Sequence, residues 1–230
     1  MKNIRNILYV SLFILILIGS AVYGNKTANS FHDNTNVNEL VKQSGVLLSL
    51  DDTGQFSSIY FNNNLSSFDQ LENESELIVK VKLSRNRINY TQAVRTLVHV
   101  TDVFKGNEVK IGDNIIIFEP SNFLGLNYFS LDGYNLMRSD KEYILFLKHL
   151  KKPEAYHYTD DQAVTFMPIS SYYAKYPMNS LSGEGYLSRE DLDKGINYSS
   201  IKDWDIFTTD QNKLKKYNEL KKIVINRMVK

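Results

Sequence analysis

The chain has no cysteine, only four prolines and a single tryptophan among its 230 residues. The absence of cysteine excludes disulfide bonds, a thiolate nucleophile and thiolate metal ligands. It also excludes anchoring as a bacterial lipoprotein, because that attachment requires a cysteine at the cleavage point. The net charge is only +1, which argues against a dedicated nucleic-acid-binding protein.

Charge is spread unevenly along the chain. Residues 1–26 carry a net charge of +3 and residues 210–230 carry +5, so the segment between them carries −7. Hydrophobic residues make up 43% of the chain and aromatic residues 12%, which is ample material for a core. We therefore expect a mildly acidic folded body with a basic C-terminal tail.

The first residues are typical of a secretory signal peptide. Lys2 and Arg5 precede an apolar run over residues 7–18, and small or turn-forming residues follow. Val22 and Gly24 fit the −3 and −1 positions of a cut before residue 25. The alternative is an uncleaved signal anchor, because the apolar stretch 7–23 reaches the lower limit for a membrane-spanning helix. Either way, the body is expected to be secreted or attached to the outer face of the cytoplasmic membrane.

We divide the chain into a signal peptide or anchor (1–24), an asparagine-rich linker (25–38) and a single domain (39–230). Alternating or continuous apolar residues predict strands at about 76–83, 90–104, 115–118 and 143–147, with weaker candidates at 163–169 and 185–187. After Pro120, a loop containing Gly125, Asp132 and Gly133 is expected to lead to the segment KEYILFLKHL. The strand at 90–104 is about twice the usual length, and long strands of this kind coil as small barrels require.

Two helices are predicted beside these strands. Ser67 is placed to cap a short helix in which Phe68 and Leu71 share one face. Leu214, Tyr217, Leu220, Val224 and Met228 recur at helical spacing and predict an amphipathic helix over 210–228. The expected fold is therefore mainly β: a small OB-like barrel with a short N-terminal helix and a C-terminal amphipathic helix.

The order of the segments ELIVKVKL, AVRTLVHVTDVFKG, KIGDNIIIFEP and KEYILFL resembles the netrin-like domain, which includes the tissue inhibitors of metalloproteinases. It looks closer still to secreted proteins of unknown function from Gram-positive bacteria. The resemblance covers about residues 67–150 and implies an OB-type barrel. The resemblance implies inhibition of an extracellular protease as the alternative function. The tissue inhibitors chelate the zinc of their target through an N-terminal cysteine, however, and no residue of this chain matches that cysteine.

Several residues were weighed as catalytic or metal-binding groups. Asp52-Thr53-Gly54 is similar to the aspartic-protease loop, but that chemistry needs a second copy, which the chain lacks. His149 and His157 with Glu154 do not have the spacing of a helical metal site, and His32 lies in the predicted linker. A site assembled from distant residues, such as Asp52 with Asp102 or His99 with Asp102, stays open as a hydrolase hypothesis. We expect no catalytic residue, no metal site and no cofactor, and hence no enzyme.

The remaining candidate is a cluster of aromatic residues at 170–180. Tyr172, Tyr173 and Tyr176 suit contact with protein or carbohydrate, and packing over one end of the barrel is the alternative role. The basic residues of the tail suit anionic wall polymers or lipid headgroups, or simply the solvated face of a helix. The sequence thus favours an extracytoplasmic binding module. Its expected partner is a protein or a cell-wall polysaccharide, it contacts no nucleic acid, and it touches the membrane only through an uncleaved N-terminal segment.

Overall fold

The computed structural model describes residues 36–150, 160–178 and 185–229 of the chain, together with a few isolated positions. A compact unit spans Thr35–Lys230, and Met1–Asn34 form a separate unit. The predicted signal segment and most of the predicted linker lie outside the described residues. The body begins earlier than expected, because Asn36 bridges Ile88 and the side chain of Val37 is fully buried. The end of the predicted linker, residues 36–38, therefore belongs to the folded body.

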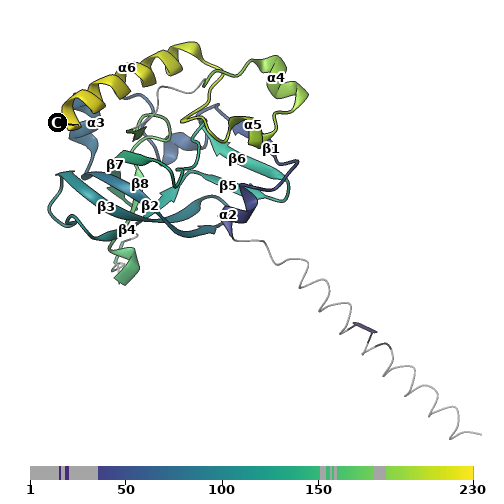
Figure 1. The fold of residues 1–230 in the computed structure, drawn as a ribbon, viewed down its shortest axis with the longest axis horizontal. Helices are drawn as coiled ribbons and strands as arrows, with labels where there is room; N and C mark the ends of the chain where they lie inside the picture. The colour runs from purple at the N-terminus through teal and green to yellow at the C-terminus, as the bar shows by residue number, and fades with distance from the viewer. Residues whose placement is uncertain are drawn as a thin grey trace, which may run out of the picture. The chain divides into compact units, whose positions relative to one another are not determined.

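The centre of the molecule is a closed five-stranded barrel (Figure 1). Its strands are β2 (Leu77–Asn89), β3 (Val94–Lys105), β4 (Asn114–Glu119), β7 (Glu142–His149) and β8 (Thr165–Pro168). They pair in the order β2-β3-β4-β8-β7, and β7 closes the ring by pairing with β2. The β4–β8 pair is parallel and the others are antiparallel. This arrangement confirms the predicted OB-like barrel.

Alternation along the strands fills the barrel with aliphatic side chains. On β2, Leu77, Val79 and Val81 point inward and are fully buried. They pack against inward residues from the other strands, which include Val98, Val100, Ile115, Ile117, Tyr143, Leu145, Leu147 and Phe166. The β2–β3 register shifts at three places, and such irregularities increase the coiling of long strands. The long strand predicted at 90–104 therefore curves as barrel closure demands.

The turn after β3 depends on glycine. Gly106 has a φ of 98°, and a Cβ atom there would lie 2.9 Å from Cδ1 of Leu77. A larger residue would be strained by the backbone and would also crowd the start of β2. Pro120 follows the last residue of β4, as expected for a residue that cannot donate to a strand ladder.

Residues 121–131 are not the loop that the sequence predicted. They form the hairpin of β5 (Ser121–Leu124) and β6 (Asn127–Leu131), and β1 (Leu47–Asp51) adds to β6 in parallel. The short alternation of apolar residues here was too brief to be read as two strands. A further strand, β9 (Lys175–Pro177), pairs with β7 outside the closed ring. The weak candidate at 185–187 contributes only an isolated bridge between Tyr186 and Thr208.

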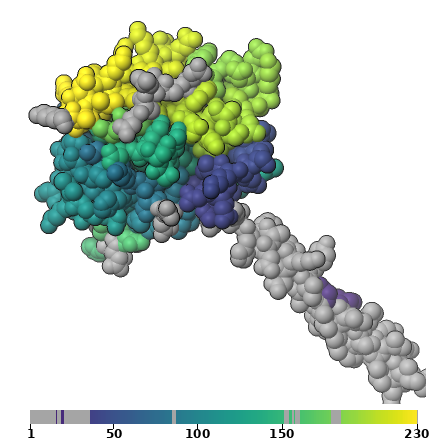
Figure 2. Space-filling view, in the orientation of Figure 1, coloured from purple at the N-terminus to yellow at the C-terminus, as the bar shows by residue number. Residues whose placement is uncertain are grey.

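In the described part of the body, five helices surround the sheets. The two predicted helices are confirmed as α3 (Phe68–Glu74), capped by Ser67, and α6 (Gln211–Met228), capped by Asp210. The others are α2 (Val37–Leu40), α4 (Arg189–Lys194) and α5 (Tyr198–Ile201), and two short 3-10 turns lie at Ser57–Ile59 and Asp160–Gln162. Figure 2 shows α6, in yellow, along one side of the body. Its buried residues Tyr217, Leu220 and Val224 join the core cluster that also contains Phe68 and Phe146.

Candidate functional site

The three tyrosines predicted to bind a partner lie in the core. Tyr172, Tyr173 and Tyr176 are at most 3% exposed, because α6 covers the segment that carries them. The ring of Tyr176 stacks on Tyr217 of α6 at 5.2 Å, and Tyr172 meets Tyr217 edge-on at 6.3 Å. Burial raises the pKa of Tyr173 to about 12, so its hydroxyl stays neutral at physiological pH. Packing over the barrel, the alternative role, is what the structure shows, and the predicted tyrosine binding surface is wrong.

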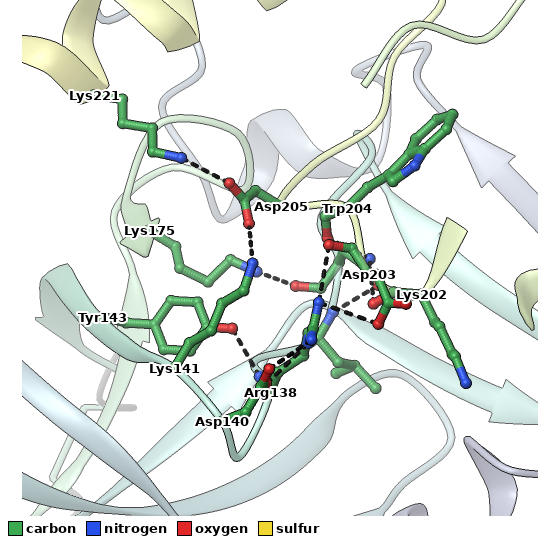
Figure 3. A network of polar contacts seen from close by, with 12 residues as sticks. Arg138, Asp140, Lys141, Tyr143, Lys175, Lys202, Asp203, Trp204, Asp205 and Lys221 are labelled. Carbon is green, nitrogen blue, oxygen red and sulfur yellow. Dashed lines mark hydrogen bonds and ion pairs between the residues drawn. The ribbon is translucent and has the colours of Figure 1, made fainter. Parts of the chain in front are cut away.

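Next to these tyrosines lies a buried charge network that the sequence did not reveal (Figure 3). Asp205 accepts hydrogen bonds from Lys141 at 2.9 Å and from Lys221 at 2.8 Å. All three side chains are nearly excluded from solvent. They come from the loop before β7, the segment before α6 and α6 itself. The network therefore fastens α6 to the barrel, and the residues lie too far apart in the chain for spacing to predict them.

Lys175 on β9 is the most perturbed basic group near this network. Its Nζ donates to the backbone oxygen of Asn135 and lies 4.2 Å from the centre of the Tyr134 ring. Burial lowers the pKa of Lys175 to about 8, although the charges of Glu119 and Asp205 act to raise it. A lysine with such a pKa is a candidate nucleophile or base in an open site. Here the side chain is 3% exposed, and this burial supports a structural role.

Glu119, the last residue of β4, is fully buried among donors. Its carboxylate accepts hydrogen bonds from Thr96 at 2.5 Å, Arg87 at 3.2 Å and Tyr134 at 3.2 Å, and from the backbone N–H of Met137 at 2.7 Å. A buried carboxyl group needs this degree of hydrogen bonding to offset the loss of its hydration. The arrangement holds the segment after β6 against the barrel.

Ser171 and Asp132 form the one described pair that is suggestive of a nucleophile. Ser171 Oγ donates to Asp132 Oδ2 at 2.5 Å, and Asn63 Nδ2 donates to the same oxygen at 2.7 Å. Asp132 has a φ of 54°, which is unusual for a residue other than glycine. A serine needs a base that can take its proton, and a carboxylate already bonded to two donors is a poor one. The pair therefore ties residue 63 to the two neighbouring segments.

The structure also separates the titratable residues that the sequence raised as distant partners. Asp52 accepts a hydrogen bond from Thr209, and Asp102 lies 3.9 Å from Lys80. His99 contacts Asn114 across the β3–β4 pair. Each of the three has a different partner, so neither proposed pair, Asp52 with Asp102 or His99 with Asp102, is assembled by the contacts of the described residues.

The predicted histidines are likewise apart from one another. His149 Nδ1 lies 2.7 Å from Glu76 Oε2 and its Nε2 lies 3.4 Å from Glu108. Burial acts to raise the pKa of Glu76, but hydrogen bonds from the backbone and ring of His149 outweigh it and leave that pKa below its usual value. Glu154 and His157 are exposed, and His32 lies outside the described residues. Among the residues that the structure describes, no group of three or more carboxylates and histidines is placed to hold a metal ion.

A shallow groove of about 230 Å³ lies between α3 and α6. Two of its charged side chains are engaged with each other, because Arg227 pairs with Asp69 at 3.1 Å, and the Arg227 guanidinium also lies 4.4 Å from the ring of Phe68. Because these contacts join α3 to α6, the groove is a seam between two helices.

Three strongly exposed apolar side chains of the described body lie within five residues of one another. Phe56, Ile59 and Tyr60 are 69%, 72% and 55% exposed, respectively, and they lie on or beside the 3-10 turn Ser57–Ile59. The neighbouring residues Ser57 and Phe61 are buried and fix the turn from below. Sequence reasoning passed over this segment because it carries no helical or strand periodicity. We refer to Phe56, Ile59 and Tyr60 as the apolar knob.

Comparisons with known proteins do not assign the chain to a family. No protein-family model matches it, and no curated protein is significantly similar to it in sequence. In the described part of the chain, none of the helices combines the length and apolar character needed to cross a bilayer. The apolar knob is thus the feature on which a functional proposal rests.

Proposed function

We propose that this chain is an extracytoplasmic interaction module that binds a partner protein through the apolar knob. The N-terminal pattern of basic residues and an apolar run supports placement outside the cytoplasm, as a secreted or membrane-attached protein. The exposure of Phe56, Ile59 and Tyr60 carries the proposal. Apolar side chains that project together from a soluble surface mark contact sites.

The knob is held ready for binding by its own backbone. Ser58 N donates to Gly54 O at 3.1 Å and Phe61 N donates to Ser57 O at 2.8 Å, which closes the turn. Lys148 Nζ donates to the backbone oxygen of Tyr60 at 2.6 Å and ties the turn to the end of β7. A preorganised contact loses less conformational entropy on binding than a mobile one. The turn therefore presents its three side chains in one geometry.

The chemistry of the knob favours a protein over a polysaccharide. Tyr60 and Phe56 are the kinds of aromatic residue that dominate protein interfaces. Ile59 is of a size and polarity to fill an apolar pocket on the surface of a partner protein. An isoleucine offers a sugar neither a stacking face nor a hydrogen bond. The three residues together match a protein partner that has an apolar cavity.

The buried carboxylates support a module without a reaction centre. Glu119, Asp132 and Asp205 are each bonded to donors from segments distant in the chain. These bonds hold the outer layer on the barrel, and this structural role accounts for the presence of buried carboxylates.

Photocrosslinking tests this proposal. Benzoylphenylalanine is introduced in place of Ile59 in the full chain, in the cells that produce it, with Ile111 as the matched control because it is 66% exposed. We expect a discrete crosslinked adduct from position 59 but not from position 111, and a lower yield when Phe56→Ala is added. Equal adduct patterns from both positions would contradict the proposal.

The inhibitor hypothesis stays a prediction that rests on the resemblance. The same experiment bears on it, because the adduct from position 59 would then contain an extracellular protease. Titrating the wild-type chain into that protease would lower the rate at which the protease cleaves its substrate. The Ile59→Ser variant would leave that rate unchanged.

A further inference from the structure

A second exposed apolar surface lies at one end of the small sheet, and we propose that it contacts the lipid bilayer. It consists of Leu47, Leu124 and Leu126, which are 44–51% exposed, with Tyr90, which is 47% exposed. We refer to these four residues as the leucine end. It is separate from the apolar knob and does not depend on the function proposed for that knob.

Backbone pairing brings the three leucines together. Leu124 and Leu126 flank Gly125 in the two-residue turn between β5 and β6, and Leu47 N donates to Leu126 O at 2.9 Å. Gly125 has a φ of 56° at the first central position of the turn, where hairpins favour glycine. Figure 1 shows β1, β5 and β6 side by side, with this turn at one edge of the body.

The leucines cannot fold back into the core because their neighbours fill it. Phe123 and Tyr128, on either side of the turn, are buried and their rings lie 5.0 Å apart. Tyr128 and Tyr198 of α5 pack at 4.1 Å behind them. The turn is therefore a stiff projection whose apolar side chains face outward.

The folded body begins at this same end. Asn36 bridges Ile88 near the end of β2, and the next residue, Asn89, exchanges two hydrogen bonds of 2.8 Å with the backbone of Phe123. Tyr90 follows in the β2–β3 turn. The first described residue of the body, Asn36, thus lies beside the leucine end.

The sequence before residue 36 gives the reason to choose lipid as the occupant. An apolar run covers residues 7–23, and residues 24–35 join it to the body. A connection of that length spans at most ~40 Å when extended and ~20 Å as a flexible coil. The proposal rests on the uncleaved form of this segment, in which the connection would keep the body within that distance of the membrane surface. Leucine suits the acyl region and tyrosine suits the headgroup level.

The chain offers a clean way to test this, because it has no cysteine. A single Asn127→Cys substitution, at an exposed position opposite Leu47, is labelled with an environment-sensitive NBD dye and leaves the four residues intact. The full chain is reconstituted in vesicles of phosphatidylcholine and phosphatidylglycerol that contain lipid-linked quenchers. Ile111→Cys is the matched control. Ile111 lies in the turn between β3 and β4, and the N–H of the next residue, Gly112, donates to the backbone oxygen of Val100. Val100 pairs with Val81, eight residues along β2 from Asn89, so roughly 25 Å of strand separates Ile111 from the leucine end.

We expect a blue-shifted emission and quenching by lipid at position 127, and neither change at position 111. A Leu124→Ser/Leu126→Ser variant should lose quenching at position 127 by roughly threefold or more, with its thermal unfolding unchanged. Equal responses at the two labelled positions, or quenching that survives the double substitution, would overturn the proposal. A blue shift without lipid quenching would also overturn it, because the dye would then be covered by protein and not by lipid.

Discussion

The interior of the barrel and the layer between the barrel and α6 are both buried, yet they are built from different side chains. Inside the barrel, residues such as Val79, Val98 and Ile117 fill space without hydrogen bonds. The outer layer contains stacked tyrosines and the ionic contacts of Asp205 with Lys141 and Lys221. The barrel is therefore determined by the packing of apolar side chains of matching volume. The docking of the C-terminal segment is determined by particular pairs of charged and polar groups.

Removing the central carboxylate is the most severe test of this difference. Asp205→Ala leaves two lysines buried without their anion, and we expect a loss of about 3–5 kcal/mol in the free energy of unfolding. Chemical denaturation of the full chain measures it. Asp203→Ala is the matched control, because Asp203 pairs with Arg138 on the surface and its loss should cost less than about 1 kcal/mol. Similar losses in both variants would remove the distinction between the two kinds of pair.

A pH series tests the outer layer by a second route. Lys175 binds its proton less tightly in the folded protein, where its pKa is about 8, than in the unfolded chain, where it is 10.5. The unfolded state therefore holds more protons just above pH 8, and the free energy of unfolding should rise by about 0.5–1 kcal/mol between pH 8 and pH 9. Above about pH 9.5 the trend reverses, because burial raises the pKa of several tyrosines, among them Tyr134 and Tyr217, and these lose their protons first in the unfolded chain.

Lys175→Met supplies the control for that series. Methionine keeps the length of the side chain and removes the charge, so the rise between pH 8 and pH 9 should disappear. A rise of unchanged size in this variant would show that another group is responsible.

In the barrel interior, the free energy of unfolding should depend on the volume of the substituted side chain and hardly at all on which apolar group supplies that volume. Leu145 is fully buried there, and Leu145→Met should lower the free energy of unfolding by less than about 1.5 kcal/mol. Leu145→Ala, which opens a cavity, should cost about 2–5 kcal/mol. Denaturant titrations of the two variants measure both losses in the free energy of unfolding. Equal losses would mean that the interior depends on more than filled space.

Local sequence features predicted the barrel because strand alternation is itself local. The inward positions of β2 and β3 follow from the period of two, and Gly106 and Pro120 mark where strands end. The caps of α3 and α6, Ser67 and Asp210, are equally local signals. The hairpin β5–β6 escaped detection because strands of four and five residues carry too few positions to show a period.

The tyrosines at 172–176 show what local sequence patterns do not predict. Their composition fits an exposed binding surface and a packed core equally well, and only the docking of α6 decided in favour of the core. The apolar knob and the leucine end were missed for the same reason, since exposure belongs to the assembled molecule. No spacing in the chain brings Lys141, Asp205 and Lys221 together.

By itself, the sequence determined that a closed β-barrel forms and that a helix ends the chain, because periodicity and caps act over a few residues. Tertiary structure alone decided which aromatic residues are buried, which lysines meet Asp205 and which apolar side chains remain outside. Those outcomes depend on contacts between segments that are distant along the chain. The contribution of such contacts to the free energy of folding depends on how the layers pack.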